Sequence, residues 1–508
     1  MNLSLTSMLQ LSILLPLVAT LLIATTGSKP NLREFVSIGT SLVLLYFVSK
    51  LYQGLEHGES ISVLVWQWLP GLQLSFGIEP MGMIFALVAS VLWPITTLYS
   101  IGYMRKHEEH NQTRFYACFA IAMGSVMGIA FADNLFTLFV FYEILTLSTY
   151  PLVTHSGTEE AKQAGRLYLG VLLGTSIVFF LFAIISTWFV AGTLDFKVGG
   201  IFQPDVNKTL AGTILVLFIL GIGKAAIMPF HRWLPAAMVA PTPVSALLHA
   251  VAVVKAGVFT VLKVCVFIFG LDLLSVLPST QFLLYLAGAS VLLASFIAMR
   301  QDNLKARLAY STISQLGYVT IGALLATPSS IVGSSMHIAM HAFGKITLFF
   351  CAGAILITAH KSKISEMRGL GLQMPITMSA FFIASLCIIG LPPAGGTWSK
   401  WYLLMGTVES GQWALMTALG ISSLLNIAYL LPIPVRAFFP MTSSSKPSYK
   451  VPDDTRSFSD LQVKEAPLFS LLALSITALG CVILFIYPLP LYELSTAILE
   501  LSGVSHEK

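Results

Sequence analysis

The sequence predicts an all-α integral membrane protein with about fourteen transmembrane helices. Hydrophobic residues make up 56% of the 508-residue chain and charged residues only 10%, and the mean hydropathy is +0.83. Soluble domains carry about 25% charged residues. The chain also contains repeated apolar runs near the length of about 20 residues that a membrane-spanning helix needs. Together these observations exclude an ordinary soluble domain.

Each apolar run is interpreted as one helix. The predicted ranges, in chain order, are roughly 8–27, 33–52, 78–103, 114–131, 134–154, 165–190, 209–231, 243–269, 281–299, 307–326, 332–359, 376–408, 412–438 and 468–489. The first run has no Lys or Arg before Lys29, unlike the charged start of a signal peptide, so we expect a retained helix.

Two stretches outside the helices are distinctive. Residues 62–76, SVLVWQWLPGLQLSF, alternate apolar and polar residues around Pro70 and Gly71, which predicts a short outer β-hairpin. Residues 441–467 form the only long polar stretch and predict a cytoplasmic loop.

Lys and Arg are distributed unevenly about the predicted membrane. Nineteen of the 28 lie in or beside the loops that follow odd-numbered helices, and only four lie on the opposite side. Cytoplasmic loops are enriched in Lys and Arg, so we expect both termini on the outer side. A miscounted helix would erase this asymmetry, which therefore supports the count of fourteen.

Five ionisable residues stand in apolar surroundings: Glu143, Lys224, Lys255, Lys345 and Lys400. A charge at the bilayer centre costs about 2.5–3.5 kcal/mol on insertion scales. Taken additively, the five would cost about 12–18 kcal/mol, which exceeds the typical net stability of a domain, about 5–15 kcal/mol. They must therefore be paired, hydrated or held neutral, and we interpret them as a proton-conducting line through a transporter.

Two of these lysines stand beside predicted helix breaks. Pro229 follows Lys224 in helix 7, and GLPPAGGTWSK interrupts helix 12 and ends at Lys400. Broken helices at matching positions indicate a transport path. Their separation by five helices predicts two inverted five-helix repeats, helices 4–8 and 9–13. The chain is accordingly divided into residues 1–110, 111–270, 271–440 and 441–508.

Histidines extend the candidate line. His337, His341 and Lys345 recur at every fourth residue and share one helix face, and His249 precedes Lys255. Imidazole can relay protons because its two nitrogens are distinct and its pKa is near neutrality. Alternatives stay open: Lys224 could extend to the cytoplasmic interface, and His337 could make a structural hydrogen bond. A metal site at His337 and His341 lacks a third ligand, so no metal or other cofactor is expected.

Four blocks of sequence resemble a known family. They read GKAAIMPFHRWLPAAMVAPTPVSALLHAVAVVKAGVF, NLKARLAYSTISQLGYV, HIAMHAFGKITLFFCAGAI and GLPPAGGTWSK. They are similar to blocks of the proton-conducting antiporter-like family, which includes subunits of Mrp-type cation/proton antiporters, respiratory complex I and membrane-bound hydrogenases. The resemblance covers about residues 80–440.

The resemblance implies the fourteen-helix fold and roles for single residues. Glu143 matches the glutamate of helix 5, and Lys224 the helix-7 lysine that pairs with it. Lys255 or His249 matches the helix-8 relay, Lys345 the central lysine of helix 11, and Lys400 the terminal residue of helix 12. Chain size and Lys400 favour the D type among Mrp subunits.

We therefore expect a proton-translocating subunit of a multisubunit monovalent cation (Na⁺ or K⁺)/H⁺ antiporter in the cell (inner) membrane. One alternative is a proton-pumping subunit of an NADH:quinone oxidoreductase or a membrane-bound hydrogenase, with the redox site in partner chains. A third is a structural subunit whose charges lock helices together. The expected partners are other membrane subunits, the lipid bilayer, H⁺ and Na⁺, and no nucleic acid.

Overall fold

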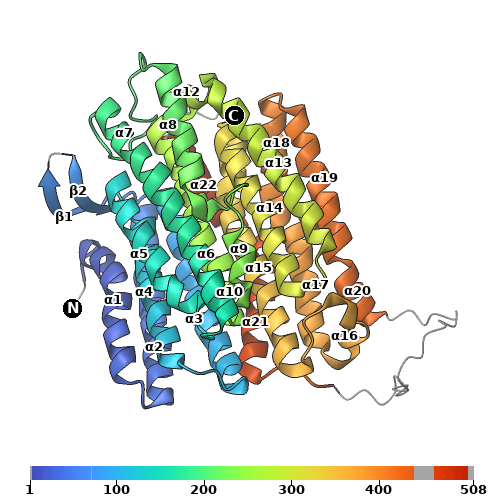
Figure 1. The fold of residues 1–508 in the computed structure, drawn as a ribbon. Coiled ribbons are helices and arrows are strands. Elements are labelled where there is room, and N and C mark those ends of the chain that lie inside the picture. The colour runs from blue at the N-terminus through green and yellow to red at the C-terminus, as the bar shows by residue number, and fades with distance from the viewer. Residues whose placement is uncertain (1–2, 70, 440–462, 502–508) are drawn as a thin grey trace.

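The computed structural model describes residues 3–69, 71–439 and 463–501, most of them in helices that run side by side (Figure 1). Twelve helices in these ranges are long and apolar enough to cross a membrane. Two shorter apolar helices, α8 (Lys208–Gly221) and α17 (Pro375–Ile389), occupy the places of the two predicted broken helices. The helical membrane fold is confirmed, and the inverted relation of the two five-helix sets stays a prediction.

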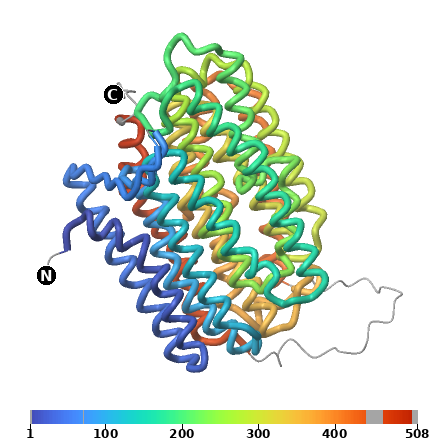
Figure 2. Tube along the Cα trace, turned by 60° about the vertical axis from the view of Figure 1, so that its left-hand side comes forward, coloured from blue at the N-terminus to red at the C-terminus, as the bar shows by residue number. Residues whose placement is uncertain are grey.

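The N-terminal part consists of three long helices and a hairpin: α1 (Leu5–Thr25), α2 (Pro30–Glu56), β1 (Ser62–Leu69), β2 (Leu72–Gly77) and α3 (Pro80–Lys106). β1 and β2 pair in antiparallel fashion, so the predicted hairpin is confirmed. The hairpin projects from the side of the helix bundle where α1 and α2 lie (Figures 1 and 2).

The first five-helix set contains nine helical pieces: α4 (Gln112–Ala130), α5 (Leu135–Val153), α6 (Glu159–Thr175), α7 (Leu181–Ala191), α8, α9 (Trp233–Ala236), α10 (Thr242–Ala246), α11 (Val253–Val264) and α12 (Leu271–Val276). Wider π-helical turns connect some of them, at Ser176–Phe180, Leu247–Val251 and Cys265–Phe269. The Asn134 side chain caps α5 by accepting a hydrogen bond from the Thr137 N–H at 2.8 Å. After α8 the chain makes only a short 3₁₀ turn, Gly223–Ala225, so helix 7 is broken as expected.

The second set contains eight pieces: α13 (Pro278–Arg300), α14 (Leu304–Leu325), α15 (Pro328–Ala359), α16 (Leu370–Gln373), α17, α18 (Gly396–Glu409), α19 (Trp413–Leu430) and α20 (Pro432–Phe438). Thr327 and Ser330 form a capping box at the start of α15. At 32 residues α15 is the longest helix of the described ranges, and it packs against α14, α17, α18 and α21. Helix 12 is broken between α17 and α18, as expected.

The C-terminal part differs from the prediction. The last predicted helix, 468–489, is α21 (Leu468–Ile486), and a further helix that was not predicted, α22 (Leu489–Leu501), follows it. Both pack against α3 and α15, so the end of the chain returns to its first third (Figure 2). Most of the predicted loop 441–467 lies outside the described residues.

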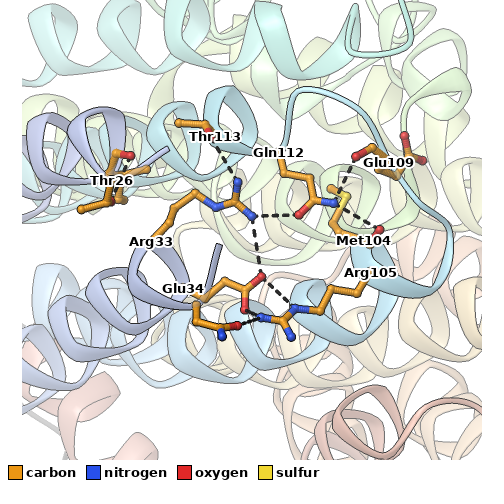
Figure 3. A network of polar contacts seen from close by, with 10 residues as sticks. Thr26, Arg33, Glu34, Met104, Arg105, Glu109, Gln112 and Thr113 are labelled. Carbon is orange, nitrogen blue, oxygen red and sulfur yellow. Dashed lines mark hydrogen bonds and ion pairs between the residues drawn. The ribbon is translucent and has the colours of Figure 1, made fainter. Parts of the chain in front are cut away.

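A network of charged and polar side chains joins the ends of α2, α3 and α4 (Figure 3). The Arg105 guanidinium binds both carboxylate oxygens of Glu34, at 3.1 and 2.5 Å. Arg33 donates to Oε1 of Gln112 at 2.8 Å and to Oγ1 of Thr113 at 3.1 Å. Arg33 and Glu34 are each only 4% exposed. Arg33 and Arg105 are among the nineteen cations counted for the orientation of the chain, and the structure shows that they also bind α2 to α3 and α4.

Replacing Glu34 by Ala should lower the free energy of unfolding by about 2 kcal/mol, because it leaves the buried Arg33 and its neighbour Arg105 without a shared counter-charge. Thermal unfolding of the purified protein in detergent measures the loss. Glu159→Ala is the matched control, because the Glu159–Lys162 ion pair is exposed and such pairs contribute about 0–1 kcal/mol. Equal shifts in the two variants would contradict the prediction.

Candidate functional site

The predicted site residues lie on central elements of the bundle. Their locations are α5 (Glu143), the turn Gly223–Ala225 (Lys224), the π-helical turn Leu247–Val251 (His249), α11 (Lys255), α15 (His337, His341 and Lys345) and α18 (Lys400). None of these lysines and histidines is more than 5% exposed. Lys224 is fully buried, so in this structure it does not extend to the membrane surface.

The Lys224 ammonium is held by α5. Nζ donates to the carbonyl oxygen of Tyr142 at 2.8 Å and to Oγ1 of Thr146 at 2.5 Å. It also lies 3.1 Å from the centroid of the Tyr142 ring, a cation–π contact. The backbone N–H of Lys224, freed by the end of α8, donates to the Tyr142 hydroxyl at 3.2 Å. Both the backbone and the side chain at the break are therefore bound to α5.

The expected direct pairing of Glu143 with Lys224 is not present in this structure. Within the described ranges, no hydrogen bond or ion pair joins the two side chains, and both carboxylate oxygens of Glu143 are inaccessible and unpaired. The reason is geometric: successive residues of a helix point about 100° apart. The ammonium lies against the Tyr142–Thr146 face of α5, and the side chain of Glu143 leaves the helix about 100° away from that of Tyr142.

Three buried lysines have the same kind of neutral partner set, one backbone carbonyl and one hydroxyl. Lys224 donates to Tyr142 O and to Thr146 Oγ1. Lys345 donates to Leu308 O at 3.2 Å and to Ser311 Oγ at 2.7 Å. Lys400 donates to Ile389 O at 3.0 Å and to Ser423 Oγ at 3.2 Å.

This partner set suits a group that gains and loses a proton. A hydroxyl accepts a hydrogen bond from an ammonium, and after rotation it donates one to the lone pair of a neutral amine. A carboxylate partner, by contrast, would favour the charged form alone. The lysine pockets can therefore hold either protonation state without rearrangement of the helices.

Lys255 and two histidines form a second arrangement. Nζ of Lys255 lies 2.5 Å from Nδ1 of His341. The His341 ring stacks on the His337 ring with centroids 5.7 Å apart, and Nδ1 of His337 is bonded to Ser399 at 2.9 Å. Ser399 precedes Lys400, so these residues link α11, α15 and α18 through direct contacts.

Tyr318 brings Lys400 into the same cluster. Its ring stacks on His337 at a centroid distance of 5.9 Å, and Nζ of Lys400 lies 4.7 Å from the ring centroid. His249 stands apart from this cluster: its ring packs on Phe349 at 4.8 Å, and neither ring nitrogen has a partner among the described residues. Lys224 and Lys345 also stand apart from this cluster, because α5 holds Lys224 and α14 holds Lys345.

One buried ion pair was missed by the sequence reasoning. Nζ of Lys263 lies 2.8 Å from Oε1 of Glu79 and donates to Ala132 O at 2.6 Å. Lys263 follows Lys255 by eight residues and so lies on the same side of α11. That spacing could have identified Lys263 as a candidate site residue, but it does not reveal that Glu79, at the start of α3, is its partner.

In the part of the chain that the structure describes, no group of three or more His, Cys, Asp or Glu side chains is placed to hold a metal ion.

The family model described as "NADH:quinone oxidoreductase/Mrp antiporter, TM" matches residues 132–426, which include all eight predicted site residues. NADH-quinone oxidoreductase subunit N of Desulforudis audaxviator is 30% identical over 469 residues, covering 91% of each chain. A probable K(+)/H(+) antiporter subunit of Rhizobium meliloti is 33% identical over 384 residues. That match covers 73% of this chain but only 37% of the relative.

Two solved structures share the fold. A chain of the Mrp complex from Dietzia sp. DQ12-45-1b superposes with a TM-score of 0.85 at 21% identity and covers 98% of both chains. A chain of the membrane-bound sulfane sulfur reductase, an archaeal respiratory membrane complex, gives a TM-score of 0.82 at 24% identity and covers 97% of both. At these identities the likeness establishes the fold alone.

The position of the broken segment depends on Gly257, two residues beyond Lys255. A Cβ atom built at Gly257 would overlap the backbone of Lys224 and Ala225, so only glycine lets α11 approach the turn this closely.

Replacing Gly257 by Ala should destabilise the fold by about 1–3 kcal/mol through overpacking. Thermal unfolding measures this loss. Gly420→Ala on α19 is the control, since no atom of the described residues lies within 4 Å of a Cβ there. A Gly257→Ala variant as stable as the control would contradict the prediction, because the turn Gly223–Ala225 would then be able to move away from the added methyl group.

Proposed function

We propose that this chain, which belongs to the NADH:quinone oxidoreductase/Mrp antiporter transmembrane family, is a proton-translocating, antiporter-like subunit of a multisubunit membrane complex. The observation that supports this most directly is the contact series Lys255–His341–His337 beside Lys400, all at most 5% exposed. Ionisable residues inside the membrane are expensive and are characteristic of ion or proton paths.

The proposed transfer begins at Lys255. Its ammonium gives a proton to Nδ1 of His341, leaving a neutral amine and an imidazolium. The imidazolium then releases the proton from Nε2, on the other side of the ring, because both nitrogens carry hydrogen in the charged form. The line continues through His337 and Ser399 toward Lys400.

Lys224 and Lys345 act as storage positions in this proposal. Each ammonium is held by a carbonyl and a hydroxyl that also accommodate the neutral amine. Glu143 has no hydrogen-bond partner among the described residues, so approach of its carboxylate would favour the charged form of Lys224 and its withdrawal would favour proton release.

The complex is proposed to be a monovalent cation/H⁺ antiporter, with this chain in a role similar to that of Mrp subunits. The fold agrees over nearly the full length of a chain of an Mrp complex, and one relative carries the name of a probable K(+)/H(+) antiporter component. A second candidate is a proton-pumping subunit of a redox complex. It is favoured by the 91% mutual coverage with an NADH-quinone oxidoreductase subunit N.

In the complex reconstituted in proteoliposomes, Lys255→Met and His341→Phe should each reduce proton flux at least tenfold, because each removes a proton carrier. Fluorescence quenching by a pH-sensitive dye after a Na⁺ or K⁺ pulse measures the flux and identifies the cation. Lys162→Met is the control, since Lys162 is exposed and paired with Glu159. Wild-type flux in both site variants would refute the assignment.

Identification of the co-purified subunits by mass spectrometry separates the two candidates. Co-purified small hydrophobic antiporter subunits, together with cation-dependent flux, would support the antiporter. Flavin-binding or cluster-binding subunits would support the redox complex instead.

The chain is further proposed to lie in the cell membrane with both termini outside. A membrane-impermeant maleimide added to intact cells should label Ser275→Cys but not Ser156→Cys. Ser275 is exposed on the short helix α12, which follows predicted helix 8, and Ser156 is exposed in the turn that follows predicted helix 5. Membrane disruption should make Ser156→Cys reactive, which controls for burial of the thiol. The reverse labelling pattern would invert the orientation.

A further inference from the structure

Gln315 is a buried amide that has no hydrogen-bond partner in the described part of the chain. It is fully buried in α14, and neither Oε1 nor Nε2 is paired. Buried polar groups are nearly always bonded to protein atoms or to ordered water. Its neighbour Ser314 follows that rule, since its hydroxyl is bonded to Ser295 at 2.9 Å and to Ser422 at 3.1 Å. The unpaired amide therefore indicates a partner other than a protein group.

The register of two helices places Gln315 beside the histidines. Only Ala326 and Thr327 separate α14 from α15, and the two helices run antiparallel. Ser311 of α14 contacts Lys345 of α15, and Tyr318 contacts His337. Gln315 follows Ser311 by four residues and precedes Tyr318 by three, so it shares their face. On α15, the residue opposite Gln315 lies midway between Lys345 and His337, and that residue is His341.

The two histidines present unpaired nitrogens at this level. Nε2 of His341 and Nε2 of His337 are both buried and without a partner within the described ranges. The rings are stacked, with centroids 5.7 Å apart and planes 28° apart. Imidazole N–H bonds lie in the ring plane, so stacked rings at this distance cannot hydrogen-bond to one another directly. A proton cannot pass between the rings without a bridging group.

We infer that Gln315 positions a buried water molecule that bridges Nε2 of His341 and Nε2 of His337. This inference deepens the proposed function and rests on it for the direction of proton movement, but the water site itself follows from the unpaired atoms. Buried waters typically make about three hydrogen bonds to otherwise unpaired groups. One amide and two imidazole nitrogens supply that number.

The amide suits this position because it both donates and accepts. The His341 imidazolium releases its Nε2 proton to the water, and the water passes a proton to Nε2 of His337. The Gln315 oxygen and N–H₂ orient the water for either direction of transfer without taking the proton themselves. Gln315 is thus a positioning residue, and its removal should slow transfer without removing any titratable group.

The test uses the intact complex and two readouts. Gln315→Met keeps the length of the side chain and removes both polar atoms. It should abolish the water density between the two rings in a cryo-EM map at about 2 Å resolution, and it should reduce proton flux about tenfold. Gln315→Asn keeps the amide and should retain more than half of the flux. Thr320→Val is the control on the same helix, because within the described residues the Thr320 hydroxyl bonds only to Leu316 O, and both water and flux should be unchanged.

The outcomes separate this inference from the proposed function. No water between the rings in the wild-type map, or water that persists in Gln315→Met, would overturn the assignment. Unchanged flux in Gln315→Met, with flux lost in Lys255→Met, would overturn the role of Gln315 in transfer. Water lost in Gln315→Met while Lys255→Met and His341→Phe conduct normally would support the water site and reject the proposed function.

Discussion

Placing a lysine inside a membrane without a counter-charge is the constraint on which this structure depends. Lys224, Lys345 and Lys400 each meet it with one backbone carbonyl and one hydroxyl. α5 supplies both for Lys224, α14 supplies both for Lys345, and α17 and α19 supply one each for Lys400. A buried carboxylate would bind an ammonium more tightly, and breaking such a pair is costly. Neutral partners make burial tolerable while leaving the lysine free to change its charge. At the second break, the carbonyl of Ile389 at the end of α17 binds Lys400, and at the first break the freed backbone N–H of Lys224 donates to the Tyr142 hydroxyl.

Much of the fold could be predicted because composition and charge asymmetry act over whole segments. Twenty apolar residues identify a span, and Pro229 or GLPPAGGTWSK identifies a break, whatever the neighbours are. Features that depend on one residue or on distant packing were not visible. The π-helical turns lie within continuous apolar runs that do not mark them, and α22 is a short helix that packs against α3 and α15, which lie far away in the sequence.

The site divides in the same way. Lysines and histidines are conspicuous in apolar runs, since few residue types are so costly to bury. Their partners are not. Thr146, Ser311, Ser423 and Tyr318 are ordinary membrane-helix residues in the sequence, and only the register of the helices shows that they receive the lysines. The absence of direct contact between Glu143 and Lys224 likewise depends on which face of α5 the ammonium meets, and residue identity alone does not specify this.

The Lys263–Glu79 ion pair attaches one end of α11 to the beginning of α3. Because that end is fixed, any tilt of α11 displaces the end at Lys255 more than the end at Lys263. Lys255 lies eight residues away, about 12 Å at the rise of an α-helix, so a tilt of about 5° would displace it by about 1 Å. That displacement is enough to weaken the 2.5 Å contact between Lys255 and His341, while the end of the helix at Lys263 stays in place. The Lys255–His341 contact is therefore the part of the proposed proton path that is most sensitive to the tilt of α11.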